Sequence, residues 1–244
     1  MMPVESATRV ISAASAEFGD SLAILTSFQR EGLVIVDLAM RIAPGISVLT
    51  IDTGRLPAAT NRMIAQVEER YGIRVERILP DVGEVDAMVS RHGSDLFRDG
   101  VAQRMLCCNI RKVRPLARRV AGMKAFFTGM RREQSADREG IEFFDRSRSP
   151  VRVNPLADWT AADVAQYTVN HGLPEHPLYA AGYRSIGCEP CTRAVAAGEE
   201  ERAGRWWWEG DTAKECGLHF SPDGRMERTV DVLLRDLLER TVVA

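Results

Sequence analysis

The sequence has no long hydrophobic run, although 45% of its 244 residues are hydrophobic. A helix that crosses a bilayer needs roughly 18 to 20 apolar residues in succession, and no segment approaches that length. Residues 1–20 also lack the charged and then apolar pattern of a signal peptide. We therefore expect a cytoplasmic protein that does not use a membrane. Its length suits one large α/β domain, or one domain and a tail.

Acidic residues are absent from residues 101–132, where nine Lys and Arg residues give a charge of +9 in a chain whose net charge is −2. A basic run is most often a solvated helix face and less often a nucleic-acid patch. Aromatic side chains, on which bases stack, are scarce here, since only Phe126 and Phe127 occur. We therefore expect no nucleic acid partner. Because Cys107 and Cys108 lie in the same segment, a compact polyanionic ligand or cluster is the competing explanation of its charge.

Cysteines are few, and four of the five fall into two close pairs, Cys107–Cys108 and Cys188–Cys191. In a reducing compartment, cysteines are more often metal ligands or catalysts than disulfides. The Cys-x-x-Cys pair places two sulfurs within reach of one metal, and the second pair completes four ligands. Spacing alone does not distinguish zinc from an iron–sulfur cluster. A cube of four irons suits the diverging side chains of adjacent cysteines, and nearby cations would offset its negative charge: Arg111, Lys112 and Arg114.

The fifth cysteine, Cys216, has no partner of this kind and lies in a charged segment between Lys214 and His219. Nearby positive charge favours the thiolate, which is the form that attacks an electrophile. Gly217 lets the backbone turn tightly beside it. A lone cysteine is usually a small buried hydrophobe, but charged neighbours are rarely buried. We predict that Cys216 is a nucleophile, with an inert buried thiol as the alternative.

Short apolar segments alternate with helical patterns through most of the chain. Strands are predicted over Leu22–Thr26, Ile46–Ile51, Ile73–Leu79 and Lys124–Thr128. Helices are predicted over Val10–Phe18, Leu33–Ala43, Ala58–Tyr71, Val82–His92 and Asn109–Val120, with Pro115 kinking or splitting the last. This alternation predicts parallel βαβ units and a doubly wound, mostly parallel sheet, which is an α/β fold.

The second half of the chain is predicted to add an edge strand over Val151–Leu156 and a helix that Thr160 caps. Asp163 stands three residues after Thr160, the spacing of a capping box. The three tryptophans at 206–208 are predicted to be core residues rather than an exposed stacking surface. A last helix is predicted over Met226–Thr241.

Polar segments follow three of the predicted strands. Ser27–Gly32 joins a strand to a helix, and the amides of such a loop face the sheet edge where anions bind. Asp52–Gly54 ends the next strand, as a turn signal or as a ligand contact. Arg131 and Arg132 follow the strand at 124–128 and could clamp an oxyanion. An exposed surface turn is the alternative for these arginines.

Four motifs, taken in order, resemble those of the assimilatory adenylyl-sulfate reductases, within the sulfonucleotide (PAPS) reductase family. They are Cys107–Cys108, Gly187–Arg193, Gly204–Glu209 and Lys214–His219. The resemblance extends from about Ser21 to His219. It implies a fold of the adenine-nucleotide α-hydrolase-like (PP-loop, Rossmann-like) type. We expect a nucleotide-binding α/β domain over residues 1–200 and a C-terminal segment, 201–244, that carries Cys216.

The resemblance also implies the site residues. One 4Fe-4S cluster would be bound by Cys107, Cys108, Cys188 and Cys191. The substrate would be bound by the phosphate loop, the segment after the second strand, a lysine near the cluster, the arginine loop and a histidine in the tail: Ser27, Phe28, Gln29, Glu31, Asp52, Thr53, Gly54, Lys112, Arg131, Arg132, Gln134 and His219.

The activity implied by the resemblance is reduction of adenosine 5′-phosphosulfate in sulfate assimilation and cysteine biosynthesis. Cys216 would form an S-sulfocysteine intermediate, and thioredoxin or a similar dithiol protein would release sulfite. Three other functions stay open: a reductase of the 3′-phosphorylated nucleotide, a PP-loop ATP pyrophosphatase that modifies tRNA, and a zinc-stabilised binding module. Whether the chain forms a homo-oligomer is also left open.

Overall fold

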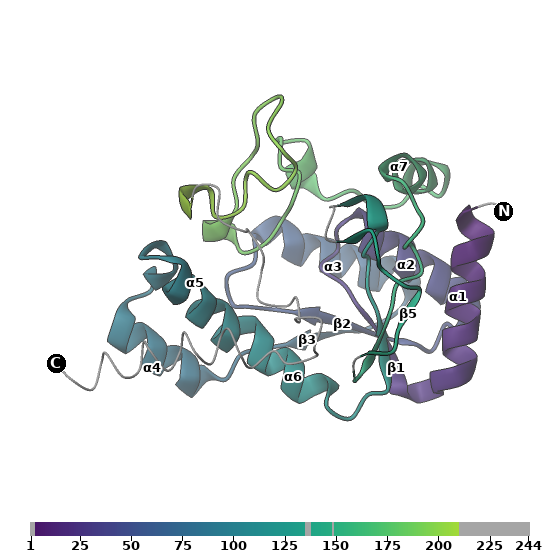
Figure 1. The fold of residues 1–244 in the computed structure, drawn as a ribbon, viewed down its shortest axis with the longest axis horizontal. Helices are drawn as coiled ribbons and strands as arrows, with labels where there is room; N and C mark the ends of the chain where they lie inside the picture. Colours follow the sequence, from purple (N-terminus) through teal and green to yellow (C-terminus); the bar gives the residue numbers. More distant parts are fainter. Residues whose placement is uncertain (1–2, 135–137, 148, 210–244) are drawn as a thin grey trace. The chain divides into compact units, whose positions relative to one another are not determined.

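The computed structural model describes residues 3–134, 138–147 and 149–209 (Figure 1). The chain divides into two compact units. The first unit consists of Met1–Thr50, Pro57–Arg77 and Val120–Ala181. The second unit consists of Ile51–Leu56, Ile78–Arg119 and Gly182–Ala244. Within the described ranges, no helix has both the length and the apolar character needed to cross a membrane.

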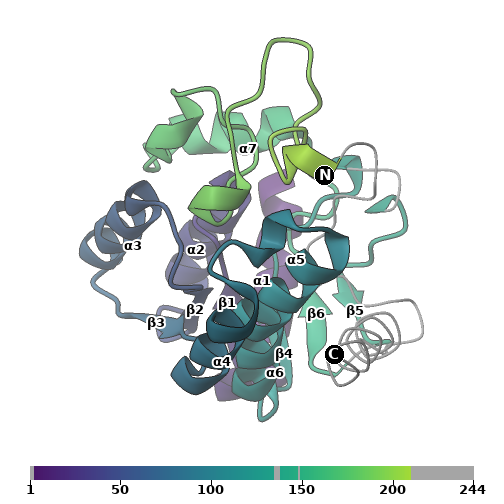
Figure 2. The same ribbon diagram turned by 90° about the vertical axis from the view of Figure 1, so that its left-hand side faces the viewer.

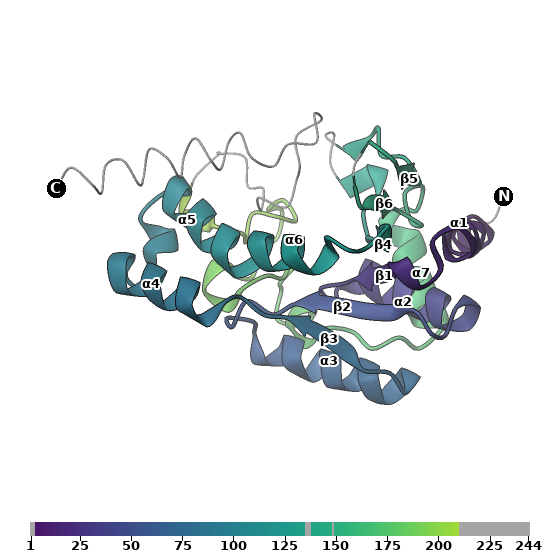
Figure 3. The same cartoon turned by 90° about the horizontal axis from the view of Figure 1, so that it is seen from below.

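A six-stranded sheet has the strand order β3-β2-β1-β4-β6-β5 (Figure 3). Its strands are β1 (Leu22–Leu25), β2 (Ser47–Ile51), β3 (Val75–Ile78), β4 (Ala125–Phe127), β5 (Phe144–Asp145) and β6 (Val151–Val153). β1 pairs in parallel with β2 and β4, and β4 pairs in parallel with β6. The pairing of β5 with β6 is antiparallel. The predicted α/β fold with a mostly parallel sheet is confirmed.

The central strands are short and apolar throughout. Leu22, Ala23 and Ile24 of β1 and all three residues of β4 are buried. Such continuous burial is typical of parallel strands, which rarely show the alternation of half-exposed strands. Ile24 aligns with Val48 on one side and with Phe127 on the other, so β1 lies at the centre of the apolar core.

Among the described residues, the first unit contains four α-helices: α1 (Pro3–Phe18), α2 (Arg30–Ile42), α3 (Ala58–Tyr71) and α7 (Ala161–Asn170). α2 lies between α1 and α3 in Figure 1 and Figure 2, and it packs against both α1 and α7. Its residues Leu33–Ala39 are all buried, as expected for a helix that is covered on more than one side. The predicted capping box of α7 is confirmed, since Thr160 and Asp163 exchange side-chain and backbone hydrogen bonds.

A buried carboxylate ties three of these helices together. Asp37 of α2 is 2% exposed and accepts hydrogen bonds from Tyr71 of α3 (2.9 Å), Tyr167 of α7 (2.7 Å) and Arg41 (3.0 Å). Burial alone would raise the pKa of Asp37, but these three donors outweigh it and hold that pKa below its ordinary value. Burial and the same carboxylate raise the pKa of Tyr71 to about 12. The cluster therefore contains one anion and two protonated phenols at neutral pH.

The second unit contains α4 (Val82–His92), α5 (Val101–Cys108), a π-helical turn over Asn109–Val113 and most of α6 (Arg114–Val120). The predicted helix over 109–120 is thus split, because Pro115 has no N–H to continue the α-helical hydrogen bonds. A separate apolar cluster forms its core, and Trp206 in it is fully buried, as predicted. The prediction is wrong for Trp207 and Trp208, which are only half-buried. α5 was not predicted, because its apolar positions are interrupted by Gln103 and Arg104.

The predicted edge strand is wrong in position and in length. β6 covers only Val151–Val153 and lies between β4 and β5, so it is an interior strand. The edge on this side of the sheet is formed by β5, whose two residues are too few to show a strand pattern in the sequence. The predicted boundary at residue 200 stays a prediction. Cys216, His219 and the predicted helix over Met226–Thr241 lie outside the described residues.

Candidate functional site

The loop between β1 and α2 is a tight turn with little freedom. The Thr26 hydroxyl accepts a hydrogen bond from the Phe28 amide at 3.0 Å. Phe28 has a φ of 58°, in the left-handed region that non-glycine residues rarely adopt. A Cβ atom on Gly32 would lie 2.1 Å from the Thr26 hydroxyl oxygen, so only glycine fits there. These contacts fix the backbone of the predicted phosphate loop.

The predicted ligand residues of this loop differ in exposure. The Phe28 side chain is fully buried and belongs to the core, so it shapes the loop. Ser27 is exposed, and its hydroxyl accepts a hydrogen bond from the Gln29 amide group at 2.9 Å. The loop therefore offers the polar side chains of Ser27 and Gln29, but not that of Phe28, to a ligand.

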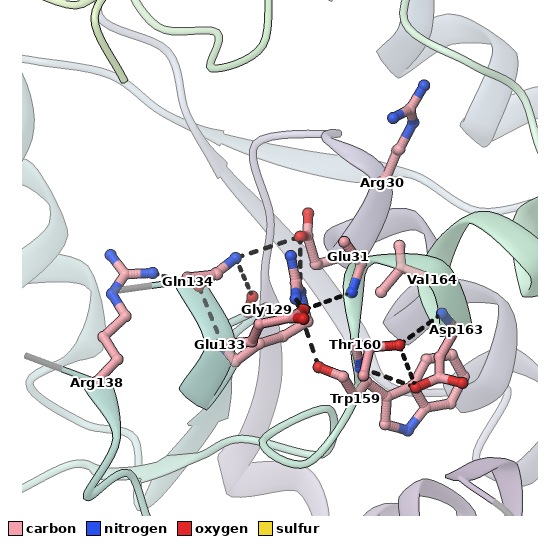
Figure 4. A network of polar contacts seen from close by, with 12 residues as sticks. Arg30, Glu31, Gly129, Glu133, Gln134, Arg138, Trp159, Thr160, Asp163 and Val164 are labelled. Carbon is pink, nitrogen blue, oxygen red and sulfur yellow. Dashed lines mark hydrogen bonds and ion pairs between the residues drawn. The ribbon is translucent and has the colours of Figure 1, made fainter. Parts of the chain in front are cut away.

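Glu31 connects this loop to the arginine loop after β4 (Figure 4). Arg131 donates from Nε to Glu31 at 3.0 Å, and Gln134 donates to the same carboxylate oxygen at 3.2 Å. The structure thus brings together three residues that the sequence placed in one site. They lie at the carboxyl ends of β1 and β4, where the strand order reverses direction. Open α/β sheets bind their ligands at this switch point.

Both arginines of the loop already have partners within the protein. Arg131 is 4% exposed and also donates to Glu133 at 2.9 Å, so two carboxylates neutralise its charge. Arg132 donates to the Ile141 carbonyl oxygen at 2.8 Å and forms an ion pair with Asp158. The alternative of an exposed surface turn is wrong for Arg131. An incoming anion would have to compete with Glu31 and Glu133 for its guanidinium group.

The Asp52–Gly54 segment lies in the second unit, beside a cysteine. Thr53 is 1% exposed, and its hydroxyl oxygen lies 3.2 Å from the sulfur of Cys188. Arg111 donates to the Thr53 carbonyl oxygen at 2.9 Å. Asp52 accepts from the Gly54 amide at 3.0 Å, and Gly54 has a φ of 71°, so the segment is also a true turn. The Thr53 side chain is thus directed to the cysteines.

The four paired cysteines are buried thiols that form no disulfide, each 7–8% exposed. Cys107, Cys188 and Cys191 belong to one apolar cluster with Trp206. Burial raises the pKa of Cys191 to about 12, with a further rise from Cys188 that Lys112 opposes. Burial likewise raises the pKa of Cys107, and Arg111 opposes that rise. Among the described residues, no group of three or more His, Cys, Asp and Glu side chains could hold a metal ion.

Several cations surround these thiols. Arg111 and Lys112 lie on the π-helical turn that directly follows Cys108. The charge of Arg55 opposes the rise in the pKa of Cys107, and the charge of Arg205, which is only 5% exposed, opposes the rise in the pKa of Cys191. A Cβ atom on Gly187 would lie 2.3 Å from the Arg205 guanidinium group, so a larger residue there would displace that group. Sequence reasoning missed Arg205, although its place directly before three tryptophans was a signal.

The model of the phosphoadenosine phosphosulfate reductase domain family matches residues 21–194, which is most of the chain. The chain belongs to this family. The family resemblance predicted from the four motifs is confirmed.

Curated relatives of the reductase family agree with this assignment. The adenosine 5′-phosphosulfate reductase of Allochromatium vinosum is 44% identical over 208 residues, covering 83% of this chain and 81% of the relative. The adenosine 5′-phosphosulfate reductase of Burkholderia cepacia is 45% identical over 204 residues, covering 83% of this chain and 82% of the relative.

Solved structures support the fold of the reductase family. The phosphoadenylyl-sulfate reductase of Candida auris, solved as a phosphate complex, has a TM-score of 0.66 at 26% identity and covers 78% of this chain and 90% of its own. Yeast FAD synthetase has a TM-score of 0.52 at 14% identity and covers 78% of this chain and 67% of its own, which is a likeness of fold alone. The predicted PP-loop type of nucleotide-binding fold is confirmed.

Two predicted site residues of this reductase-family chain remain predictions. Cys216 and His219 lie outside the described residues, and they also follow the last residue matched by the family model. Their assignment as nucleophile and substrate contact rests on the sequence motif alone.

Proposed function

We propose that this chain reduces adenosine 5′-phosphosulfate to sulfite and AMP, with thioredoxin as electron donor. The observation that carries the proposal is the set of four buried cysteines in the second unit, in a chain 44–45% identical to relatives named adenosine 5′-phosphosulfate reductase. By the family resemblance, reductases of the 3′-phosphorylated nucleotide usually lack these cysteines. The reaction belongs to sulfate assimilation and cysteine biosynthesis, and a reduced thioredoxin donor is consistent with the cytoplasm.

We infer that Cys107, Cys108, Cys188 and Cys191 hold a 4Fe-4S cluster. Although no three of these side chains are placed to bind a single metal ion in the described residues, their chemistry suits a cluster of several irons, because the thiols form no disulfide, are buried and lie near cations that would offset its negative charge. A hydroxyl group 3.2 Å from the Cys188 sulfur adds a hydrogen-bonding partner of the kind that ligating sulfurs have. When bound, the cluster would act electrostatically and structurally, because thioredoxin supplies both electrons.

The first step is nucleophilic displacement at sulfur. The Cys216 thiolate attacks the sulfate sulfur, a bond forms between the two sulfur atoms, and the bond from sulfur to the phosphate oxygen breaks. AMP leaves with that electron pair, and Cys216 becomes S-sulfocysteine. Dividing the reduction in this way replaces one difficult step by two easier ones. Positive side chains lower the repulsion between the thiolate and the anionic substrate.

The second step releases sulfite. A thioredoxin thiolate attacks the Cys216 sulfur, and sulfite leaves with the electron pair of the sulfur–sulfur bond. The second thioredoxin thiol then opens the mixed disulfide, which regenerates the Cys216 thiol. Thioredoxin is oxidised to its disulfide, so the two electrons that reduce the sulfate sulfur are accounted for.

Nucleotide binding is proposed at the switch point of the sheet. Ser27 and Gln29 supply polar side chains there, and Glu31, Arg131 and Gln134 connect the two loops that end β1 and β4. The remaining proposed contacts are those that the resemblance assigns: Phe28, Asp52, Thr53, Gly54, Lys112, Arg132 and His219.

A product assay tests the proposed function. Purified protein with adenosine 5′-phosphosulfate and reduced thioredoxin should release AMP and sulfite in equal amounts, and Cys216→Ser should abolish both. Full yield from Cys216→Ser would contradict the mechanism. The 3′-phosphorylated nucleotide, offered in competition, should be a poor substrate. Cleavage of ATP to AMP and pyrophosphate would instead favour a tRNA-modifying enzyme.

A further inference from the structure

The segment that follows α7 is anchored to α3 through a buried histidine. His176 is 1% exposed, and its Nε2 atom lies 3.0 Å from the Thr60 hydroxyl oxygen. Its Nδ1 atom accepts a hydrogen bond from the Leu178 amide at 3.3 Å, so Nε2 bears the proton of the neutral ring and donates to Thr60. Burial lowers the pKa of His176, which favours this neutral form. This anchor holds the segment around His176 within the first unit.

Two residues on either side of this anchor contact Arg30, the first residue of α2. Arg30 donates from Nε to a carboxylate oxygen of Glu175 at 2.9 Å. Its guanidinium carbon lies 4.3 Å from the centre of the Tyr179 ring, a cation–π distance. The Arg30 amide donates to the Tyr179 hydroxyl oxygen at 3.4 Å. Because Tyr179 contacts both the backbone and the side chain of Arg30, the guanidinium group lies close to the start of α2.

Arg30 is the only Lys or Arg in the predicted phosphate loop, Ser27–Gly32. In Figure 4 its side chain points away from Glu31, which belongs to the arginine-loop network. The Arg131 side chain in that network is 5% exposed and is paired with two carboxylates. The Arg30 side chain is 34% exposed, and one carboxylate is its ionic partner among the described residues. Of these two arginines, Arg30 is the one that can more easily change its partner.

The Arg30–Glu175 ion pair is weak enough to be exchanged for a ligand. The two side chains are 34% and 52% exposed, and ion pairs at such exposure contribute little to stability, because water solvates both groups. A phosphate group accepts bidentate, charge-assisted hydrogen bonds from a guanidinium group. A phosphate monoester also carries more negative charge than a carboxylate at neutral pH. Arg30 therefore gains more from a nucleotide phosphate than it loses with Glu175.

We propose that Arg30 binds the 5′-phosphate of the nucleotide and that Glu175 holds it beside the phosphate loop until the nucleotide arrives, an inference that rests on the proposed function. Arg30 is not among the residues that the family resemblance assigns to the substrate. Its stacking on Tyr179 is kept during the exchange, because the His176 anchor does not depend on Glu175. The phosphate loop thereby gains a cation that does not have to leave two carboxylates, as Arg131 does.

Two substitutions in the same ion pair separate a binding role from a structural one. In Arg30→Gln, the affinity for AMP measured by calorimetry should fall by about 10-fold, the effect of losing one charge-assisted hydrogen bond. Adenosine, which has no phosphate, should bind with its original affinity. In Glu175→Gln, AMP should bind about two- to fivefold more tightly, because Arg30 no longer has to leave a carboxylate. Tyr179 has further contacts, so it is left unchanged in the test.

A double variant and a control complete the comparison. In Arg30→Gln/Glu175→Gln, the AMP affinity should equal that of Arg30→Gln, because Glu175 acts through Arg30. Arg146→Gln is the matched control, since Arg146 also pairs with an exposed glutamate and lies beside an aromatic ring in the same unit. It should bind AMP with the original affinity.

Equal losses of AMP affinity in Arg30→Gln and Glu175→Gln would overturn the proposal, because the intact pair would then only shape the loop. Unchanged AMP affinity in Arg30→Gln would overturn it as well, and so would an equal gain from Glu175→Gln with and without Arg30. If Arg30→Gln does not fold, Glu175→Gln decides alone, since AMP binding that is unchanged or weaker contradicts the exchange.

The unaltered protein separates this inference from the proposed function. If it neither binds AMP nor releases sulfite from adenosine 5′-phosphosulfate, the proposed function fails and the role of Arg30 fails with it. If it does both and Arg30→Gln binds AMP normally, the role of Arg30 alone is wrong.

Discussion

At the scale of single residues, burial decides what Arg131 can do. A guanidinium group at the end of a strand is a good oxyanion clamp when it is exposed, but Arg131 is 4% exposed and lies between Glu31 and Glu133. In this arrangement it holds two loops together. The same side chain can bind substrate only by exchanging a carboxylate for a substrate oxyanion.

Replacing Arg131 by Met should therefore lower stability as well as activity. The change leaves Glu31 without its cation in a site where that side chain is 18% exposed, so the free energy of unfolding should fall by about 3 kcal/mol. Urea unfolding monitored by circular dichroism measures this. Arg146→Met is the control, because its pair with Glu17 is exposed and should contribute little. Equal losses in the two variants would contradict the structural role of Arg131.

Gly32 offers a second test at this scale. In Gly32→Ala the new methyl group would meet the Thr26 hydroxyl oxygen at 2.1 Å, which forces the phosphate loop to move. We expect a loss of about 1–3 kcal/mol in unfolding free energy, and weaker AMP binding by calorimetry. Gly45→Ala has open space around its Cβ position and should retain AMP binding. Normal AMP affinity in Gly32→Ala would remove this loop from the nucleotide site.

At the scale of secondary-structure elements, Asp37 of α2 links this helix to α3 and α7 through hydrogen bonds. Its hydrogen bonds are made to the ionised carboxylate, so its pKa in the folded protein lies below the ordinary value. A group of this kind stabilises the fold above its unfolded pKa, and that contribution is lost as the pH falls through the folded pKa. The cluster should therefore weaken in acid.

The lowered pKa of Asp37 in the folded protein predicts how the stability of Asp37→Asn depends on pH. At pH 7 the variant should be less stable than the original protein, because Tyr71 and Tyr167 lose a charged acceptor. The difference should start to shrink below about pH 4, where the carboxylate of the unfolded chain takes up a proton, and should be lost as the pH falls through the lower pKa of Asp37 in the folded protein. Urea midpoints of both proteins between pH 7 and pH 3 measure it. A difference that does not change with pH would contradict the assignment.

At the scale of the whole molecule, the two units contain different parts of the chemistry. The first unit holds the sheet, the phosphate loop and the arginine loop, and the second holds the four cysteines, Thr53 and Lys112. The core of the second unit is small and includes three of the cysteines among its apolar residues. We expect this unit to depend on the proposed cluster for stability, as small metal-binding domains do.

Cys188→Ser tests this dependence. The variant should lose iron, the brown colour expected of the proposed cluster, and activity together, and trypsin should then cleave within residues 182–209 before it cleaves within 3–50. Iron analysis and mass spectrometry of timed digests measure these effects. Glu199→Gln, in the same segment, should keep its iron and its resistance to trypsin. An iron-free variant that resists trypsin as well as the original protein would show that the unit folds without a metal.

The sequence by itself determined the local features of this protein: the alternation of strands and helices, the capping box at Thr160, the split at Pro115 and the two cysteine pairs. These depend on residues a few positions apart, whose periodicity and turn chemistry can be read directly. The ordered motifs also determined the family, because four spaced motifs together are far more specific than any one of them.

Only the tertiary structure decided which distant residues meet. Strand order made β6 interior, brought Glu31 to Arg131 and placed Thr53 beside Cys188. The Arg104–Glu209 pair joins residues 105 positions apart. No local sequence pattern predicts that these two charged side chains are buried. Such contacts depend on how the elements pack, because burial and charge pairing are properties of the assembled core and not of the neighbouring sequence.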